Sequence, residues 1–211
     1  MGGFFSNRLE DYPKAIELFE KAIELDPDDA DAYNNMGNAY YYQGDYTKSI
    51  ESYEKAIELD PDIAIAYDNM GIAYEKQESY TKSIESYEKA IELDPDNAIA
   101  YNNMGYAYDK QGNTIKAIEF YEKAIELKPD FAIAYNNMGF AYFDQGDYTK
   151  AIESYEKSIE LDPDFADAYY NMGIAYRDQG NTQLKISNYK KAARLGHQGA
   201  QDWFKKSGHD W

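Results

Sequence analysis

Residues 30–63 read ADAYNNMGNAYYYQGDYTKSIESYEKAIELDPDI, and four near copies of this stretch follow without a gap. A Met-Gly pair recurs every 34 residues, from Met36-Gly37 to Met172-Gly173. A proline recurs with the same step, at Pro27, Pro61, Pro95, Pro129 and Pro163. A fixed period of roughly 20 to 50 residues is typical of arrays in which each repeat buries its apolar face against its neighbours. The sequence therefore predicts one array of stacked repeats.

Each repeat is expected to contain two short helices. The first half has an apolar face at helical spacing, formed by Tyr33, Met36, Gly37 and Tyr40. Gly44 then suits a left-handed helix end, and Asp45 suits the N-cap of a second helix. That helix is predicted to end before Pro61, because the residue that precedes a proline avoids the α region. The predicted order within a repeat is helix, turn, helix, turn.

Three local features add expectations about packing and turns. Gly37 and its equivalents are small, so two helix backbones are expected to approach closely there, with tyrosines such as Tyr53 filling the space beside them. Asp62 is expected to be the N-cap of the helix that follows it. Glu78 replaces the turn glycine of other repeats, which predicts a tighter or strained turn at residues 77–79.

The repeats are assigned in a register that begins at Ala30. A single array is predicted over residues 1–199, followed by a capping helix and tail over 200–211. Within the array, residues 7–29 correspond to a partial repeat. The five full repeats are 30–63, 64–97, 98–131, 132–165 and 166–199.

The pattern Y-x2-M-G-x2-Y, followed by a small residue, Tyr, Ala and Pro, resembles the tetratricopeptide repeat (TPR) over about residues 7–199. This resemblance implies an all-α protein, a right-handed α-solenoid of stacked antiparallel helix-turn-helix repeats that forms a superhelix. It also implies a non-enzymatic scaffold for protein–protein interaction, with first helices that line a concave groove. Residues 189–201, YKKAARLGHQGAQ, resemble the closing stretch of Sel1-like repeats.

The resemblance places an apolar row in the groove, which predicts an interaction site because exposed apolar patches usually mark one. Asp68 and Glu75 occupy other inward positions of the second repeat. The alternative is that neighbouring helices cover the row and the isoleucines only fill gaps. The row consists of Ile65, Ile99 and Ile133, beside Ile72, Tyr106, Phe140 and Ile174.

A ladder of asparagines is the second candidate part of the groove. A primary amide offers one acceptor and two donors, which matches a peptide unit, so the ladder is expected to hold an extended peptide backbone. The alternative is that these amides bond to neighbouring helices. The ladder consists of Asn35, Asn69, Asn103, Asn137 and Asn171.

Composition argues against several classes of function. With a net charge of -18 and a pI near 4.4, nucleic acids and anionic membranes are poor partners, because phosphate binding needs clustered Lys and Arg. The chain has no cysteine, only two histidines, and no phosphate-binding or calcium-binding loop motif. We therefore expect no catalytic residues, no metal site and no cofactor.

The predicted function is binding of an extended, partly apolar peptide from a protein partner. Two alternatives remain: a self-assembling structural protein that forms a homodimer through the solenoid ends, and a regulatory portion of a larger protein. No signal peptide or transmembrane segment is visible in the sequence, which predicts a cytoplasmic location.

Overall fold

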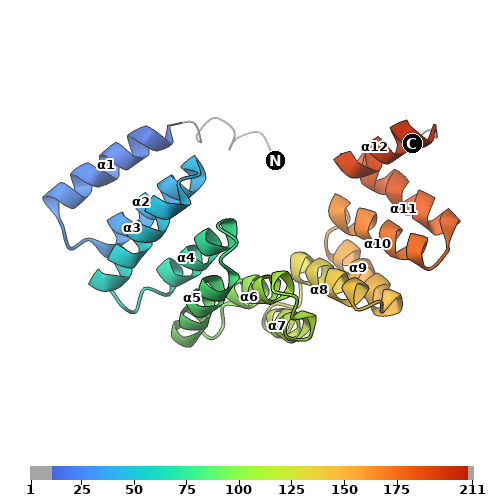
Figure 1. Ribbon diagram of the computed structural model, residues 1–211, viewed down its shortest axis with the longest axis horizontal. Helices are drawn as coiled ribbons and strands as arrows, with labels where there is room; N and C mark the ends of the chain where they lie inside the picture. The colour runs from blue at the N-terminus through green and yellow to red at the C-terminus, as the bar shows by residue number, and fades with distance from the viewer. Residues whose placement is uncertain (1–10, 209–211) are drawn as a thin grey trace. The chain divides into compact units, whose positions relative to one another are not determined.

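The computed structural model describes residues 11–208, and all regular structure within that range is helical (Figure 1). The predicted all-α solenoid of helix pairs is confirmed. The chain divides into two compact units, unit 1 (residues 1–107) and unit 2 (residues 108–211). The predicted single array over 1–199 stays a prediction, and residues 1–10 and 209–211 lie outside the described residues.

Unit 1 holds the first repeats, and its first five helices pack against one another in chain order. In Figure 1 these helices run from blue to green. The boundary with unit 2 falls inside helix α6 (Ala98–Lys110). The helices of unit 1 are α1 (Tyr12–Leu25), α2 (Ala30–Gln43), α3 (Tyr46–Leu59), α4 (Ala64–Lys76), α5 (Tyr80–Leu93) and the first part of α6 (Ala98–Lys110).

Unit 2 has paired helices of the same kind and ends with one additional helix, α12 (Gln198–Ser207). This last helix covers part of the predicted capping segment. Besides the end of α6, the helices of unit 2 are α7 (Thr114–Leu127), α8 (Ala132–Asp144), α9 (Tyr148–Leu161), α10 (Ala166–Asp178), α11 (Thr182–Arg194) and α12 (Gln198–Ser207).

The two helices of a repeat pack through a glycine that faces a tyrosine, as predicted from their sizes. A Cβ atom placed on Gly37 would lie 2.5 Å from Cε1 of Tyr53, whose side chain is only 1% exposed. The tyrosine hydroxyl reaches a polar partner, because Tyr53 Oη donates a hydrogen bond of 2.7 Å to Asn38 Oδ1. This combination of close packing and internal hydrogen bonding recurs where Tyr87 covers Gly71.

The turns confirm two predictions and correct a third. Gly44 has a left-handed φ of 89°, and the Asp45 carboxylate caps α3 by accepting a hydrogen bond from Lys48 N at 3.1 Å. Asp62 does not cap α4, so that prediction was wrong. Helix α4 begins at Ala64 with Ile63 as its N-cap, which leaves Asp62 one residue too early to reach the free N–H groups.

Glu78 closes the turn between α4 and α5 in a left-handed conformation, with φ of 57°. It is the one non-glycine residue with positive φ among residues 11–208, and the equivalent turns use Gly44, Gly112, Gly146 and Gly180. The strain expected in this turn therefore lies at Glu78, because a Cβ atom makes the left-handed conformation unfavourable.

Helix α12 closes unit 2 with an aromatic cluster. Phe204 is buried, and the Trp203 ring meets Tyr189 edge to face at 5.3 Å. His197 caps α12 by accepting a hydrogen bond from Ala200 N at 3.1 Å, and its ring stacks on Tyr170 at 4.0 Å. These contacts give His197 a structural role at the end of the helix.

Candidate functional site

The three isoleucines of the predicted apolar row are exposed. Ile65 on α4 is 59% exposed, Ile99 on α6 is 51% exposed, and Ile133 on α8 is 49% exposed. The alternative, in which neighbouring helices cover these side chains, does not hold for the described residues. Repetition at 34-residue spacing makes this exposure systematic, whereas single exposed apolar residues are common on any surface.

The other apolar members of the row differ in how far they reach solvent. Tyr106 and Phe140 are exposed, whereas Ile72 and Ile174 are half-buried. Ile174 packs against the aromatic cluster beneath α12, which gives it a structural contact as well. Ile72 and Ile174 therefore offer less surface to a partner than the five exposed members of the row do.

The ladder asparagines bond to the preceding repeat. Asn69 Nδ2 donates to Asn34 Oδ1 at 3.1 Å in unit 1, and Asn171 Nδ2 donates to Asn136 Oδ1 at 3.1 Å in unit 2. The helix-to-helix bonding considered as an alternative is therefore present at these two positions. Each amide has a second N–H, so this bonding does not exhaust its hydrogen-bonding capacity.

The remaining ladder residues have different surroundings. Asn103 is half-buried and hydrogen-bonds to the Asp68 carboxylate, within unit 1. Asn137 is also half-buried, whereas Asn35 is exposed. The ladder is thus not uniform along the chain, and its role in peptide binding stays a prediction.

Asp68 is the unusual member of the buried polar row beneath the ladder. It stands where three other repeats have Asn34, Asn102 and Asn136. Its side chain is only 8% exposed, and one of its carboxylate oxygens, Oδ1, is buried without a hydrogen-bond partner. Burial raises the pKa of Asp68 to about 6, although the hydrogen bond from Asn103 opposes this rise.

Glu75 lies two turns after Asp68 on α4 and is also perturbed. Burial raises the pKa of Glu75 to about 7, and the negative charge of Asp68 adds to the rise. The hydrogen bond of 2.9 Å from Tyr87 Oη and the charge of Lys76 act in the opposite direction. The sequence analysis predicted inward positions for Asp68 and Glu75 but did not predict their burial or their raised pKa values. The replacement of Asn by Asp at position 68 was the available signal.

Unit 2 also has two carboxyl groups with raised pKa values, Asp109 and Asp144, but their shifts are smaller. Burial raises the pKa of Asp109, and the negative charge of Asp144 adds to the effect. Burial also raises the pKa of Asp144, while Lys110 lowers it. These two carboxylates come from different helices, α6 and α8, whereas Asp68 and Glu75 belong to one helix.

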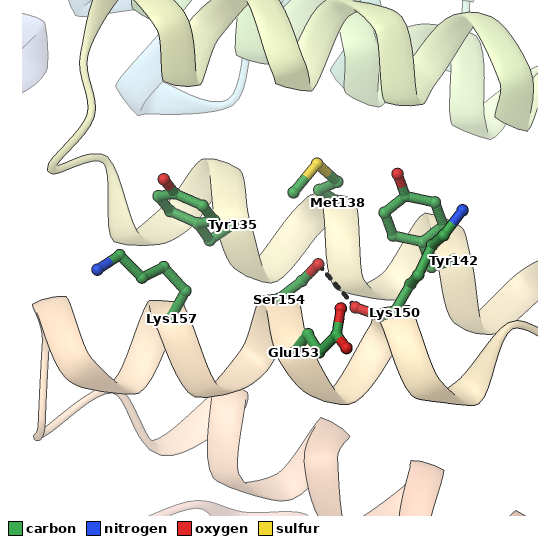
Figure 2. Close-up of a pocket in the computed structure, with 7 residues that line it drawn as sticks. All are labelled: Tyr135, Met138, Tyr142, Lys150, Glu153, Ser154 and Lys157. Atoms are coloured by element: carbon green, nitrogen blue, oxygen red, sulfur yellow. Dashed lines mark hydrogen bonds between the residues drawn. The ribbon is translucent and has the colours of Figure 1, made fainter.

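A hollow of about 350 Å³ lies between α8 and α9 in unit 2, on the face of α8 opposite Ile133. Figure 2 shows Tyr135, Met138 and Tyr142 of α8 above the side chains of α9, where Ser154 Oγ donates to Lys150 O at 2.9 Å. Equivalent residues form hollows in the first two repeats. At 100° per residue, Tyr135 and Tyr142 lie on the side of α8 away from Ile133, so the hollow and the isoleucine row are separate surfaces.

The helices and the acidic side chains bear on two other classes of site. Within residues 11–208, no helix is both long enough and apolar enough to cross a membrane. In the same range, no group of three or more His, Asp or Glu side chains is placed to hold a metal ion.

Family models match most of the chain. A model described as "TPR repeat" matches residues 8–42, 37–78, 76–112 and 139–180. Three further models described as "Tetratricopeptide repeat" match residues 98–131, 120–153 and 166–195. No curated protein matches this chain.

Solved structures give the same result. A crystal structure of MamA is 31% identical, with a TM-score of 0.69, and the match covers 79% of this chain and 97% of MamA. YrrB, described as a TPR protein with an unusual peptide-binding site, is 28% identical, with a TM-score of 0.67 and coverage of 90% and 99%. The Cut9–Hcn1 structure matches at 18% identity, with a TM-score of 0.78 and coverage of 93% and 39%, and it supports the fold alone. The protein described here belongs to the tetratricopeptide-repeat family.

Proposed function

We propose that this protein is a non-enzymatic scaffold for protein–protein interaction, which binds an extended, partly apolar peptide segment in the predicted concave groove. Ile65, Ile99 and Ile133, together with Tyr106 and Phe140, would contact apolar side chains of the peptide. Asn69, Asn103 and Asn137 would hold its backbone. The family assignment and its structural neighbours support the interaction scaffold, and the peptide and the groove are our proposal.

The exposure of the isoleucines is the observation that carries this proposal. An exposed isoleucine leaves apolar surface in water, and burying that surface under a partner is favourable by about 25 cal/mol per Å². The same position exposes an isoleucine in three consecutive repeats, at Ile65, Ile99 and Ile133. An extended peptide that buries such a row would place its own apolar residues at regular intervals.

Two further points are consistent with peptide binding. YrrB, a family member of similar length, is described by its peptide-binding site. The second N–H of Asn69 and of Asn171 leaves each amide a donor for a peptide carbonyl while the bond to the neighbouring repeat remains. Backbone contacts of this kind would add affinity without selecting particular side chains.

The test is a selection from a random-peptide display library, run in parallel on the wild type and on Ile65→Ser/Ile99→Ser/Ile133→Ser. The wild type is expected to enrich peptides with regularly spaced apolar residues, and the triple variant is expected to lose them. Ile115→Ser is the matched control, because Ile115 is 68% exposed on the second helix α7 and outside the row. Equal enrichment by all three proteins would contradict the proposal.

The asparagines need a separate arm with Asn69→Ala/Asn103→Ala/Asn137→Ala. This variant loses structural bonds such as that from Asn69 to Asn34, so its helical content and urea midpoint must be measured first. Weaker peptide binding by a folded triple variant would support the backbone-holding role. Unchanged affinity would remove the ladder from the proposed site.

Self-assembly is a second candidate, favoured by two exposed leucines on α1. Leu18 is 58% exposed and Leu25 is 88% exposed on this first described helix of unit 1. A homodimer through the solenoid ends would bury them. Light scattering over a wide concentration range tests this, and a constant monomer mass would reject it.

A further inference from the structure

Helix α4 carries two carboxylates and two isoleucines on a single face. Asp68 and Glu75 alternate with Ile65 and Ile72 at spacings of three and four residues, which brings all four to one side of the helix. Only the second of the five full repeats has a carboxylate at both acidic positions. The equivalent pairs are Asn34 and Tyr41, Asn102 and Asp109, Asn136 and Phe143, and Tyr170 and Arg177.

These two carboxylates have no cation paired with them. Of the ion pairs formed between described residues, none includes Asp68 or Glu75. Their recorded hydrogen-bond partners, Asn103 and Tyr87, are neutral. A carboxylate withdrawn from water is costly unless a cation or several hydrogen bonds compensate it, and Asp68 Oδ1 has no partner at all.

The charged and titratable groups around the pair are few. Lys76 follows Glu75 in α4 and is exposed, while Tyr41 of α2 and Tyr87 of α5 interact with Glu75 electrostatically. Neither tyrosine carries a positive charge. A cation supplied from outside the chain would therefore find a negative pair that the fold itself leaves largely uncompensated.

We propose that this face of α4 recognises a basic side chain, a lysine or an arginine of the bound peptide, beside Glu75. This inference rests on the proposed function, because it gives the peptide of that proposal a charge and a position. Glu75 is half-buried and would contact the cation directly, while the buried Asp68 would act through its charge. Ile65, which is exposed next to Asp68, would contact an apolar neighbour of the basic residue.

Charge complementarity argues for this partner over others. The chain has a net charge of -18, which attracts basic segments over a distance and repels acidic ones. The α4 pair would convert that general attraction into a specific contact. It would also define the register of a peptide on nearly identical repeats, since the other four repeats lack the pair.

The experiment uses a phage library of random dodecapeptides with three forms of the full chain. These are the wild type, Asp68→Asn/Glu75→Gln, and Glu85→Gln/Glu88→Gln as a control. The first variant is nearly isosteric and places at position 68 the asparagine that other repeats carry, so folding is expected to survive. The control removes the same charge from two exposed residues of α5 in the same repeat. Circular dichroism checks that all three proteins fold.

The wild type and the control are expected to enrich peptides with a lysine or arginine beside apolar residues, and the α4 variant is expected to lose this basic preference. A selected peptide should bind the α4 variant at least about tenfold more weakly than the control. Enriched peptides without a basic preference, or with the same preference in all three proteins, overturn this inference and leave the proposed function standing. If the wild type enriches nothing, both fail. If the control loses the basic preference to the same extent, the inference is also overturned, because the net negative charge of the chain then explains the attraction.

Proton release is a second readout. A cation beside Glu75 favours its charged form, so binding near pH 7 should release a proton fraction that calorimetry in buffers of different ionisation enthalpy can measure. Replacing the basic residue of a selected peptide with norleucine should abolish the release, as should Glu75→Gln. A wild-type complex without proton release at pH 7 counts against direct contact with Glu75.

Discussion

Replacing Asp68 with asparagine should stabilise unit 1, and the gain should depend on pH. The folded state raises the pKa of Asp68 from 3.8 to about 6, a difference of about 2.2. At about 1.36 kcal/mol for each pKa unit, the ionised carboxylate costs the fold up to about 3 kcal/mol at neutral pH. An asparagine at this position avoids that cost because it never ionises.

The sign follows from linkage. A carboxyl whose folded pKa is raised keeps its full contribution below its unfolded pKa of 3.8, and the contribution is lost as pH rises to about 6. Asp68→Asn should therefore differ little from the wild type near pH 4. It should be more stable by about 2–3 kcal/mol above about pH 7. Glu75 remains in both proteins, and its pKa should fall once the Asp68 charge is removed.

Native-state hydrogen exchange read by mass spectrometry is the appropriate assay, because repeat arrays need not unfold in one step. Amides of α4 and α5 in Asp68→Asn should exchange about a hundredfold more slowly than in the wild type at about pH 7.5, and only about two- to threefold more slowly near pH 4. Helices α10 and α11 provide an internal reference in unit 2. A protection difference that is independent of pH, or better protection of the wild type at pH 7.5, would refute the reasoning.

Three further substitutions test the packing and the turns. Glu78→Gly should raise the free energy of unfolding by about 0.5–1 kcal/mol in urea titrations, because glycine relieves the left-handed strain but loses more backbone entropy; a lower urea midpoint would contradict this. Gly71→Ala should cost about 1–3 kcal/mol, since its Cβ would lie 2.5 Å from the buried Tyr87 ring, and an unchanged midpoint would show that the ring moves freely. Asn69→Ala should cost about 1–2 kcal/mol of stability by leaving Asn34 Oδ1 without its donor. Thermal unfolding would measure this cost, with Asn69→Asp, which also has no N–H to donate, as a second variant.

The helices, their order and their turns could be predicted from the sequence, because each depends on residues that are close together in the chain. The helical spacing of Tyr33, Met36 and Gly37, and the Gly44–Asp45 break, specify a helix pair within a single repeat. The Asp62 prediction failed because capping depends on the residue at which a helix begins, and a shift of one position removes the bond.

The candidate site was only partly predictable. Its position on the first helices is a prediction from the family pattern, and the structure shows only that the three isoleucines assigned to it are exposed. Periodicity places a residue on a helix face but does not say how deeply that face is covered. For that reason Ile65 and Ile72, seven residues apart on one face, could not be distinguished beforehand as exposed and half-buried.

The sequence by itself determined a repeated helix pair with glycine facing tyrosine, since backbone preference and side-chain size act within 34 residues. Only the tertiary structure decided the chemistry of the polar residues on the first helices. The bond between Asn69 and Asn34, and the burial of the Asp68 carboxylate beneath Asn103, arise from atoms of neighbouring repeats. Solvation and hydrogen bonding depend on three-dimensional surroundings, so identical asparagines, and the one aspartate among them, acquire their properties only when the repeats stack.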